Sequence, residues 1–184
     1  MSSTSSCCDW NIDILKNLIK NTAELDVVKI IHIILQLISF FILIVCLVAD
    51  QWLSGDTGHQ GLWNVCYTNG TSSCCGKLDD VVGYKDFIGA TRAFLIIESL
   101  IFLAIFYTIY RTVYEKDPVY PVATILTIAI GICTFLSITI YGARHGDVSK
   151  STTSTMTLSV SYIFCALNLG LQIIFAGFGL YLCD

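Results

Sequence analysis

LWNVC, residues 62–66, lies in a polar loop between two apolar segments, each long enough to cross a membrane. Trp52 precedes this stretch, and Cys74 and Cys75 follow it. A loop that combines tryptophans with cysteines and is flanked by apolar helices is typical of a recognition surface anchored in a bilayer. It is not typical of a catalytic centre.

The composition is that of a membrane protein. Of the 184 residues, 55% are hydrophobic and 13% are charged, whereas a soluble domain carries about 25% charged residues. Crossing a bilayer takes about 20 apolar residues. Four stretches with at most two charged residues meet that length and predict transmembrane helices surrounded by membrane lipid, at residues 28–49, 91–110, 121–141 and 159–181. The net charge of −4 argues against nucleic acid as a partner.

The predicted helices organise the chain into two parts. Residues 1–27 form an amino-terminal segment, and residues 28–182 form a four-span membrane domain with loops at 50–90 and 142–158. The first apolar segment is too long for the core of a signal peptide and lacks a small-residue cleavage pattern, which predicts a retained span. Four spans leave no room for a separate soluble domain.

The orientation follows from the first loop. Lysines and arginines divide five against five between the two sides, so the positive-inside rule does not decide. Asn69-Gly70-Thr71 is an acceptor for N-glycosylation, and the same loop holds three cysteines. Both features suit an oxidising, lumenal compartment. We therefore expect a plasma-membrane glycoprotein with glycosylated Asn69, both loops outside and both termini in the cytoplasm.

The first loop has the pattern of a small sheet. Residues 61–67 alternate between two faces, and Asn69-Gly70 is a hairpin signal, which predicts an antiparallel sheet packed on the bundle. A turn over residues 69–72 sets Cys66 opposite Cys75, whereas a two-residue turn at Asn69-Gly70 sets it opposite Ser73. In both registers Cys75 shares a face with Cys66 and Cys74 points away.

We predict a Cys66–Cys75 disulfide from this alternation, with pairing of Cys66 to Cys74 left open. Cys74 is then an odd thiol in the predicted loop. Two interpretations remain for it: a buried, inert side chain, or pairing with a cysteine of another chain.

These residues resemble the first-loop signature of the peripheral myelin protein, epithelial membrane protein and claudin superfamily. The spacing of the two tryptophans is similar to the myelin and epithelial branch, as is Ile140–His145, whereas Ala90–Ala93 looks more like claudins. The resemblance covers roughly residues 28–182. Its motif residues in this chain are Trp52, Leu62, Trp63, Cys66, Cys75 and Arg92.

The resemblance implies an all-α membrane protein with a small β element: a left-handed bundle of four transmembrane helices with an extracellular antiparallel sheet. It implies a role in cell–cell contact, membrane organisation or a junctional barrier, with the same protein or related four-span proteins as partners. The alternative is an auxiliary subunit of a channel or receptor, as the related calcium-channel gamma subunits are. The sequence ends soon after the fourth predicted helix without a PDZ-binding tail, so anchoring of junctional strands to a scaffold is not expected.

The loop side chains admit two interpretations each. Trp52, Trp63 and Tyr67 suit contacts with a partner, but Trp52 also fits an aromatic belt and Trp63 the core of a small sheet. Charged loop residues are more often a solvated face than the lining of a pore. Among them, Asp79 and Asp80 are the sharpest candidates for a preference for cations.

Polar residues inside the predicted spans are costly and usually face the bundle interior. Glu98 and Asn168 lie at similar depths, and Gln172 shares a helix face with Asn168. They are predicted to be hydrogen-bonded neighbours that hold helices together. The alternative is an ion or proton path, which a single acid in four spans disfavours.

The amino-terminal segment carries its own pattern. Apolar residues occupy about half of a helical wheel over residues 10–25, which suits a helix lying on the inner leaflet. Cys7 and Cys8 resemble a palmitoylation site, and Cys183 is a second candidate.

Catalytic motifs are not seen in the sequence. It has no Cys-x-x-Cys pair, no phosphate-binding glycine loop and no zinc-ligand spacing, and its three histidines are dispersed. We therefore predict a protein that is not an enzyme and that needs no cofactor or metal.

Overall fold

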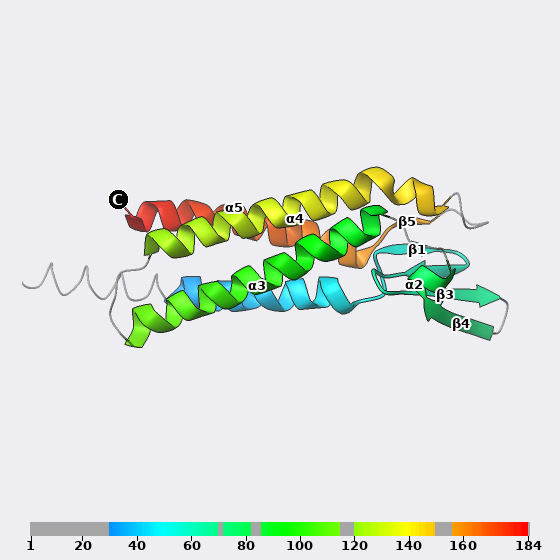
Figure 1. Ribbon diagram of the computed structural model, residues 1–184, viewed down its shortest axis with the longest axis horizontal. Helices are drawn as coiled ribbons and strands as arrows, with labels where there is room; N and C mark the ends of the chain where they lie inside the picture. Colours follow the sequence, from blue (N-terminus) through cyan, green and yellow to red (C-terminus); the bar gives the residue numbers. More distant parts are fainter. Residues whose placement is uncertain (1–29, 70–71, 82–85, 115–119, 150–155, 184) are drawn as a thin grey trace, which may run out of the picture. The chain divides into compact units, whose positions relative to one another are not determined.

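The computed structural model describes residues 30–69, 72–81, 86–114, 120–149 and 156–183. The chain divides into two compact units, Met1–Leu37 and Ile38–Asp184. The described residues of the first unit, 30–37, are helical. The second unit contains the rest of that helix, three further long helices and a sheet (Figure 1). The predicted amino-terminal helix and the candidate palmitoylation sites Cys7 and Cys8 lie outside the described residues.

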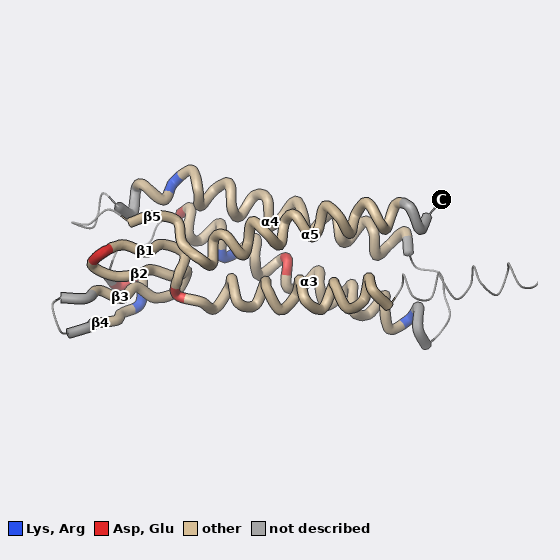
Figure 2. The backbone as a smooth tube through the Cα atoms, turned by 180° about the vertical axis from the view of Figure 1, so that it is seen from behind, with Lys and Arg blue, Asp and Glu red and all other residues tan. Residues whose placement is uncertain are grey.

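Four helices of the described chain are long and apolar enough to cross a membrane. The segments that meet this criterion are Ile30–Val48, Asp86–Arg111, Pro121–Gly146 and Val160–Leu180. The last three belong to α3 (Asp86–Tyr114), α4 (Tyr120–Ser149) and α5 (Val160–Cys183). Figure 2 shows that charged residues are sparse along the helices and gather near their ends and around the sheet. The predicted fold class, four membrane helices with a small antiparallel sheet between the first and second, is confirmed.

Local chemistry favours the ends of these helices. Asp86 lies in the first turn of α3 and Arg111 in its last, where each charge complements the helix dipole. Pro121 lies in the first turn of α4, where a missing backbone N–H removes no intrahelical hydrogen bond. Many apolar side chains along the helices point outward, as lipid contact requires; among the most exposed are Phe41, Leu100, Ile125 and Ile173.

The helix ends differ from the predicted ones. α3 begins at Asp86 rather than at residue 91 and ends at Tyr114 rather than at 110, while α4 continues to Ser149 rather than stopping at 141. The predicted ends were placed where charged residues begin. That position reflects the thickness of the hydrocarbon layer, whereas the backbone hydrogen bonds of a helix can continue beyond it. Much of the expected loop at 142–158 is therefore helical.

Helix packing within the second unit uses aromatic contacts. α4 packs against both α3 and α5. Phe40 of the first helix contacts Phe102 and Phe106 of α3, with ring centroids 5.4 Å and 5.2 Å apart. These large aromatic rings fill the space between the first helix and α3.

Among the described residues, the sheet has five antiparallel strands in the order β4-β3-β2-β1-β5. Four come from the first loop and one from the second. Their bounds are Leu53–Gly55 for β1, Gly58–Gln60 for β2, Asn64–Asn69 for β3, Ser72–Lys77 for β4 and Thr157–Leu158 for β5. A short helix, α2 (Leu78–Val81), follows β4. The sheet lies at the end of the helices away from the carboxyl terminus (Figure 1).

Gly58 closes the tight turn between β1 and β2. Its φ of 154° lies in a region that side chains disfavour, and a Cβ there would lie 2.0 Å from the carbonyl oxygen of Cys66. Only glycine allows β2 and β3 to approach this closely.

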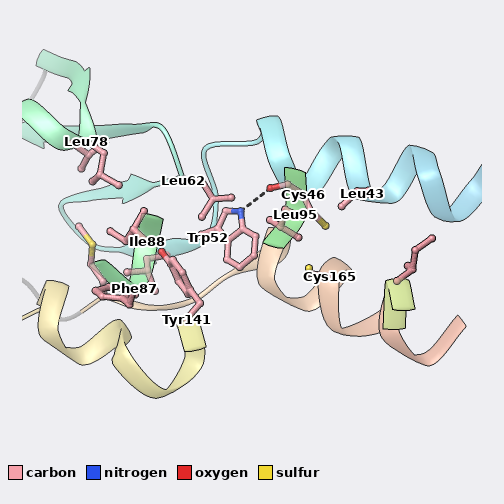
Figure 3. Close-up of a cluster of buried hydrophobic side chains, with 14 of the residues drawn as sticks. Leu43, Cys46, Trp52, Leu62, Leu78, Phe87, Ile88, Leu95, Tyr141 and Cys165 are labelled. Atoms are coloured by element: carbon pink, nitrogen blue, oxygen red, sulfur yellow. Dashed lines mark hydrogen bonds between the residues drawn. The ribbon is translucent and has the colours of Figure 1, made fainter. Parts of the chain in front are cut away.

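The apolar core continues from the helices into the base of the sheet. Trp52, Leu62 and Tyr141 are fully buried in it (Figure 3). Both loops, α3 and α4 contribute to this cluster. It includes Leu53, Val65, Leu78, Phe87, Ile88 and Met156. The first loop is thus part of the folded core and is not a free connector.

Candidate functional site

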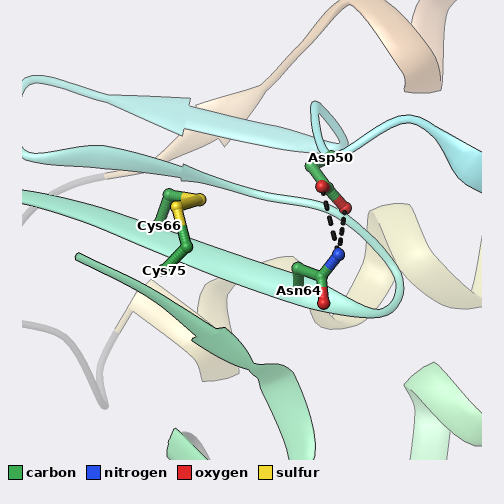
Figure 4. Close-up of a disulfide and its surroundings, with 4 residues drawn as sticks. All are labelled: Asp50, Asn64, Cys66 and Cys75. Carbon is green, nitrogen blue, oxygen red and sulfur yellow. Dashed lines mark hydrogen bonds between the residues drawn. A yellow bond between two sulfur atoms is a disulfide. The ribbon is translucent and has the colours of Figure 1, made fainter. Parts of the chain in front are cut away.

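The candidate site is a surface that we name the platform, defined as strands β1–β5 together with α2. Its strands β3 and β4 pair with Cys66 opposite Cys75, and a disulfide joins the two residues with their Cα atoms 4.1 Å apart (Figure 4). Asn69 pairs with Ser72. This is the first of the two registers that the sequence allowed.

Cys74 lies opposite Tyr67 in the same ladder and is exposed. Of the two interpretations of Cys74, the buried, inert thiol is therefore wrong, and pairing with a cysteine of another chain stays a prediction. Burial also raises the pKa of the neighbouring Tyr67 hydroxyl above its usual value. The two faces of the hairpin thus differ: one carries the disulfide and the other a free thiol.

Trp52 connects the platform to the helices from inside. Its indole nitrogen donates a hydrogen bond to the Cys46 carbonyl at 2.7 Å. Its ring packs on Tyr141 of α4, with centroids 4.7 Å apart, and more loosely on Tyr162 of α5. Figure 3 shows this ring between the loop and the helices. Trp52 is a core residue and does not contribute to the surface.

Trp63 connects the platform to the first helix from the rim. Its indole nitrogen donates to the Leu47 carbonyl at 2.7 Å, while 39% of the residue stays exposed. Its own carbonyl accepts a hydrogen bond from the backbone N–H of Leu78, at the start of α2. Both tryptophans therefore use their N–H groups on the last carbonyls of the first helix, which an α-helix leaves unpaired.

Arg92 of α3 holds three parts of the loop at once. Its Nε donates to the Leu62 carbonyl at 2.9 Å, and its two terminal nitrogens donate to the carboxylate oxygens of Asp79 at 2.9 Å and 3.0 Å. Its guanidinium carbon lies 4.7 Å from the ring centroid of Trp63. A planar group with a fork of N–H donors can make all of these contacts together.

The electrostatics of this cluster centre on Asp79. The hydrogen bonds from Arg92 hold the pKa of Asp79 below its usual value, and the opposite charge acts in the same direction. The side chain of Asp79 is half exposed, at 49%, whereas that of Arg92 is 10% exposed. The carboxylate therefore faces solvent on one side and neutralises a nearly buried guanidinium on the other.

Further polar contacts close the platform. The Asn64 amide donates to both carboxylate oxygens of Asp50, at 3.2 Å and 3.3 Å (Figure 4). The N–H groups of Ser159 and Ser161 donate to the carbonyls of Trp52 and Gln51, which ties the second loop to the first. Segments of the first and second loops thus form a single unit.

A polar cluster lies among the helices below the platform. The Asn168 amide donates to Glu98 at 3.4 Å, Ser39 donates to Asn168, and Gln172 donates to Ser39. All four residues are buried. Three helices contribute to this chain of hydrogen bonds, an arrangement that holds helices together in an apolar environment.

Three predicted site residues remain to be placed. Leu62 is fully buried. Asn69 is the last residue of β3, and Cys183 the last of α5; their side chains lie outside the described part of the chain. Among the described residues, no group of three or more His, Cys, Asp or Glu side chains is placed to hold a metal ion.

Sequence reasoning missed the partners of several residues. It indicated Asp79 as a candidate for cation preference and not as the partner of Arg92. The contacts of Asn64 with Asp50, and of Trp52 with Tyr141, were also missed. β5 was not predicted, because a two-residue strand has no periodicity to detect.

The comparisons with known proteins agree with this architecture. A search of curated proteins gave no match. The family model described as the PMP-22/EMP/MP20/Claudin family matches residues 26–178, which include the whole sheet and nearly all of the four long helices. The resemblance seen in the sequence is thereby confirmed, and the chain is a multi-pass membrane protein. It belongs to the PMP-22/EMP/MP20/Claudin family.

Proposed function

We propose that this protein acts at the cell surface in cell–cell contact, membrane organisation or a junctional barrier, through the platform and without enzymatic chemistry. The observation that supports the proposal best is the way the first loop folds. It forms a cross-linked sheet fastened to the helices by Trp52, Trp63 and Arg92. A rigid loop loses little conformational entropy when it binds a partner.

The proposed orientation places the platform outside the plasma membrane and both termini in the cytoplasm. It rests on the disulfide, which suits an oxidising compartment, and on the acceptor sequence Asn69-Gly70-Thr71. Asn69 is then a glycosylation site at the end of the β3–β4 hairpin. The partners are further copies of the chain or related four-span proteins, in the same or the opposing membrane.

The structure changes which residues should report on contact with a partner. Trp52 and Trp63 hold the fold together, so their loss disturbs the platform itself. Asp56, Lys77 and Asp80 are exposed and belong to the platform or its turns. Reversing these charges alters the surface while leaving the core and the Arg92 cluster intact.

A barrier role would depend on the same charges. Asp79 is neutralised by Arg92, so Asp80 is the better candidate for a preference for cations. In an epithelial monolayer, Asp80→Asn should lower the ratio of sodium to chloride permeability, while Lys77→Gln should not lower it. An unchanged ratio in Asp80→Asn would remove Asp80 from the barrier proposal.

Cell mixing tests the contact role. Non-adherent cells that express the protein are mixed with differently labelled cells that do not, and clusters are counted at matched surface levels. We expect expressing cells to cluster with one another, and Lys77→Glu with Asp80→Lys to reduce clustering relative to the natural protein. Absence of clustering, with co-purification of a multi-span channel instead, would contradict the contact role and support an auxiliary subunit.

A further inference from the structure

Two cysteines outside the platform meet between helices. Cys46 lies near the end of the first helix and Cys165 in the first half of α5. Both are free thiols in the same buried cluster, and the Cys46 thiol donates to the carbonyl of Ser161 at 3.5 Å, one helical turn before Cys165. Both residues are fully buried, at 0% and 1% exposure. Figure 3 shows the two side chains on facing sides of these helices.

The pair lies near the platform end of the bundle. Cys46 is two residues before Val48, the end of the first helix, and Cys165 is five residues after Val160, the start of α5. At a rise of about 1.5 Å per residue, both lie within about 8 Å of the helix ends that carry the sheet. The Cys66–Cys75 disulfide is at the same end. In the proposed orientation this end faces the oxidising compartment.

On the basis of that proposed orientation, we propose that Cys46 and Cys165 form a second disulfide that cross-links the first helix to α5. The first helix and α5 already pack against each other here, because the Cys46 thiol contacts the turn of α5 that precedes Cys165. The link would span 119 residues of sequence, from 46 to 165, whereas Cys66 and Cys75 are 9 apart. Closing a longer loop removes more entropy from the unfolded chain. The bond would also fix the carbonyl that accepts the Trp52 hydrogen bond.

The oxidant is the disulfide of a lumenal thiol–disulfide oxidoreductase. One cysteine attacks that disulfide as the thiolate and forms a mixed disulfide, and the second cysteine displaces it. Both S–H bonds break, one S–S bond forms, and the two electrons and two protons leave with the oxidoreductase as its dithiol. The exchange takes place before the helices close, because thiols buried in apolar surroundings are inert.

Thiol counting by gel shift tests the proposal in the full-length protein. Membranes are denatured without reductant in a large maleimide, which adds one mass step for each free thiol. We expect Cys46→Ser to add one step relative to the natural protein, because Cys165 is released, and Cys46→Ser with Cys165→Ser to add none. The matched control Cys133→Ser, which alters a thiol of α4, should lose one step.

The opposite pattern would overturn the proposal: one step lost in Cys46→Ser and two in the double variant. Mass spectrometry of unreduced natural protein gives a test that needs no variant. A peptide pair linked through Cys46 and Cys165 is expected beside the Cys66–Cys75 link. If only the Cys66–Cys75 link is oxidised, the second disulfide is refuted and the orientation stands. If both pairs are reduced, both the second disulfide and the proposed orientation are contradicted.

Discussion

Arg92 lies with its guanidinium carbon 4.7 Å from the ring centroid of Trp63, although one residue belongs to a membrane helix and the other to a loop. The same guanidinium binds the Asp79 carboxylate and the Leu62 carbonyl. The loop is therefore fastened to α3 by one side chain. The hydrogen-bonding geometry of the side chain at position 92 can therefore be tested separately from its positive charge.

Arg92→Lys should destabilise the platform although it keeps the positive charge. An ammonium group cannot donate to Asp79 and Leu62 in the fixed fork that arginine provides. We expect a loss of roughly 1–3 kcal/mol in the free energy of unfolding, as for lost hydrogen bonds to a charged group. Denaturation in detergent measures it. Asp79→Asn is the milder control, because Asp79 is half exposed and such pairs contribute at most about 1 kcal/mol. Equal losses in the two variants would contradict the role given to Arg92.

The Arg92–Asp79 pair should make stability depend on acid pH. Because folding lowers the pKa of Asp79, its contribution is present above the ordinary aspartate pKa of about 3.9. It is lost as the pH falls through the lower pKa of the folded state. The melting temperatures of the natural protein and Asp79→Asn should therefore differ at neutral pH and converge in strong acid. A difference that persists unchanged in acid would contradict the ion pair.

Trp52→Ala should damage the fold more than Trp63→Ala. Trp52 is fully buried against Tyr141, whereas Trp63 is 39% exposed. Removing a buried tryptophan costs roughly 3–5 kcal/mol. We expect Trp52→Ala to reach the cell surface poorly, while Trp52→Phe is less affected because it keeps most of the ring and loses one hydrogen bond. Surface biotinylation with total protein as reference measures this, and a ranking with Trp63→Ala as the worse variant would contradict it.

How much of this arrangement the sequence predicts depends on the distance between partners. The β3–β4 pair was predicted because alternation and the Asn69-Gly70 turn are local signals, although two registers remained open. Trp52 was ambiguous, because a tryptophan at a helix end looks the same in an aromatic belt and in a core. Only packing against Tyr141 from a distant helix separates these interpretations.

The Arg92 cluster shows the same limit. Asp79 and Arg92 lie 13 residues apart, with a helix beginning between them, so no helical or strand period links them. A run of acidic loop residues most often forms a solvated face, and nothing local indicates which acid has a basic partner. The family motif marked Arg92 but not what it binds.

Glu98→Gln should leave trafficking and stability nearly unchanged if the buried cluster serves packing. A glutamine keeps an oxygen that accepts from Asn168. Asn168→Leu is the contrasting variant, because it breaks the hydrogen bonds with Glu98 and Ser39, at a cost of about 1–3 kcal/mol for each buried group left unpaired. Surface level and melting temperature report on both variants. A membrane conductance that disappears in Glu98→Gln would instead favour an ion path.

Labelling of Cys74 in intact cells tests most directly whether the platform is cross-linked and faces outward. Cys74 is exposed, while Cys66 and Cys75 are joined. A membrane-impermeant maleimide added to living cells should label Cys74 without reductant, and Cys74→Ser should abolish that label. Cys66 and Cys75 should become reactive only after reduction. Labelling of Cys74 that requires permeabilised cells, or of Cys66 without reduction, would contradict an external, disulfide-linked platform.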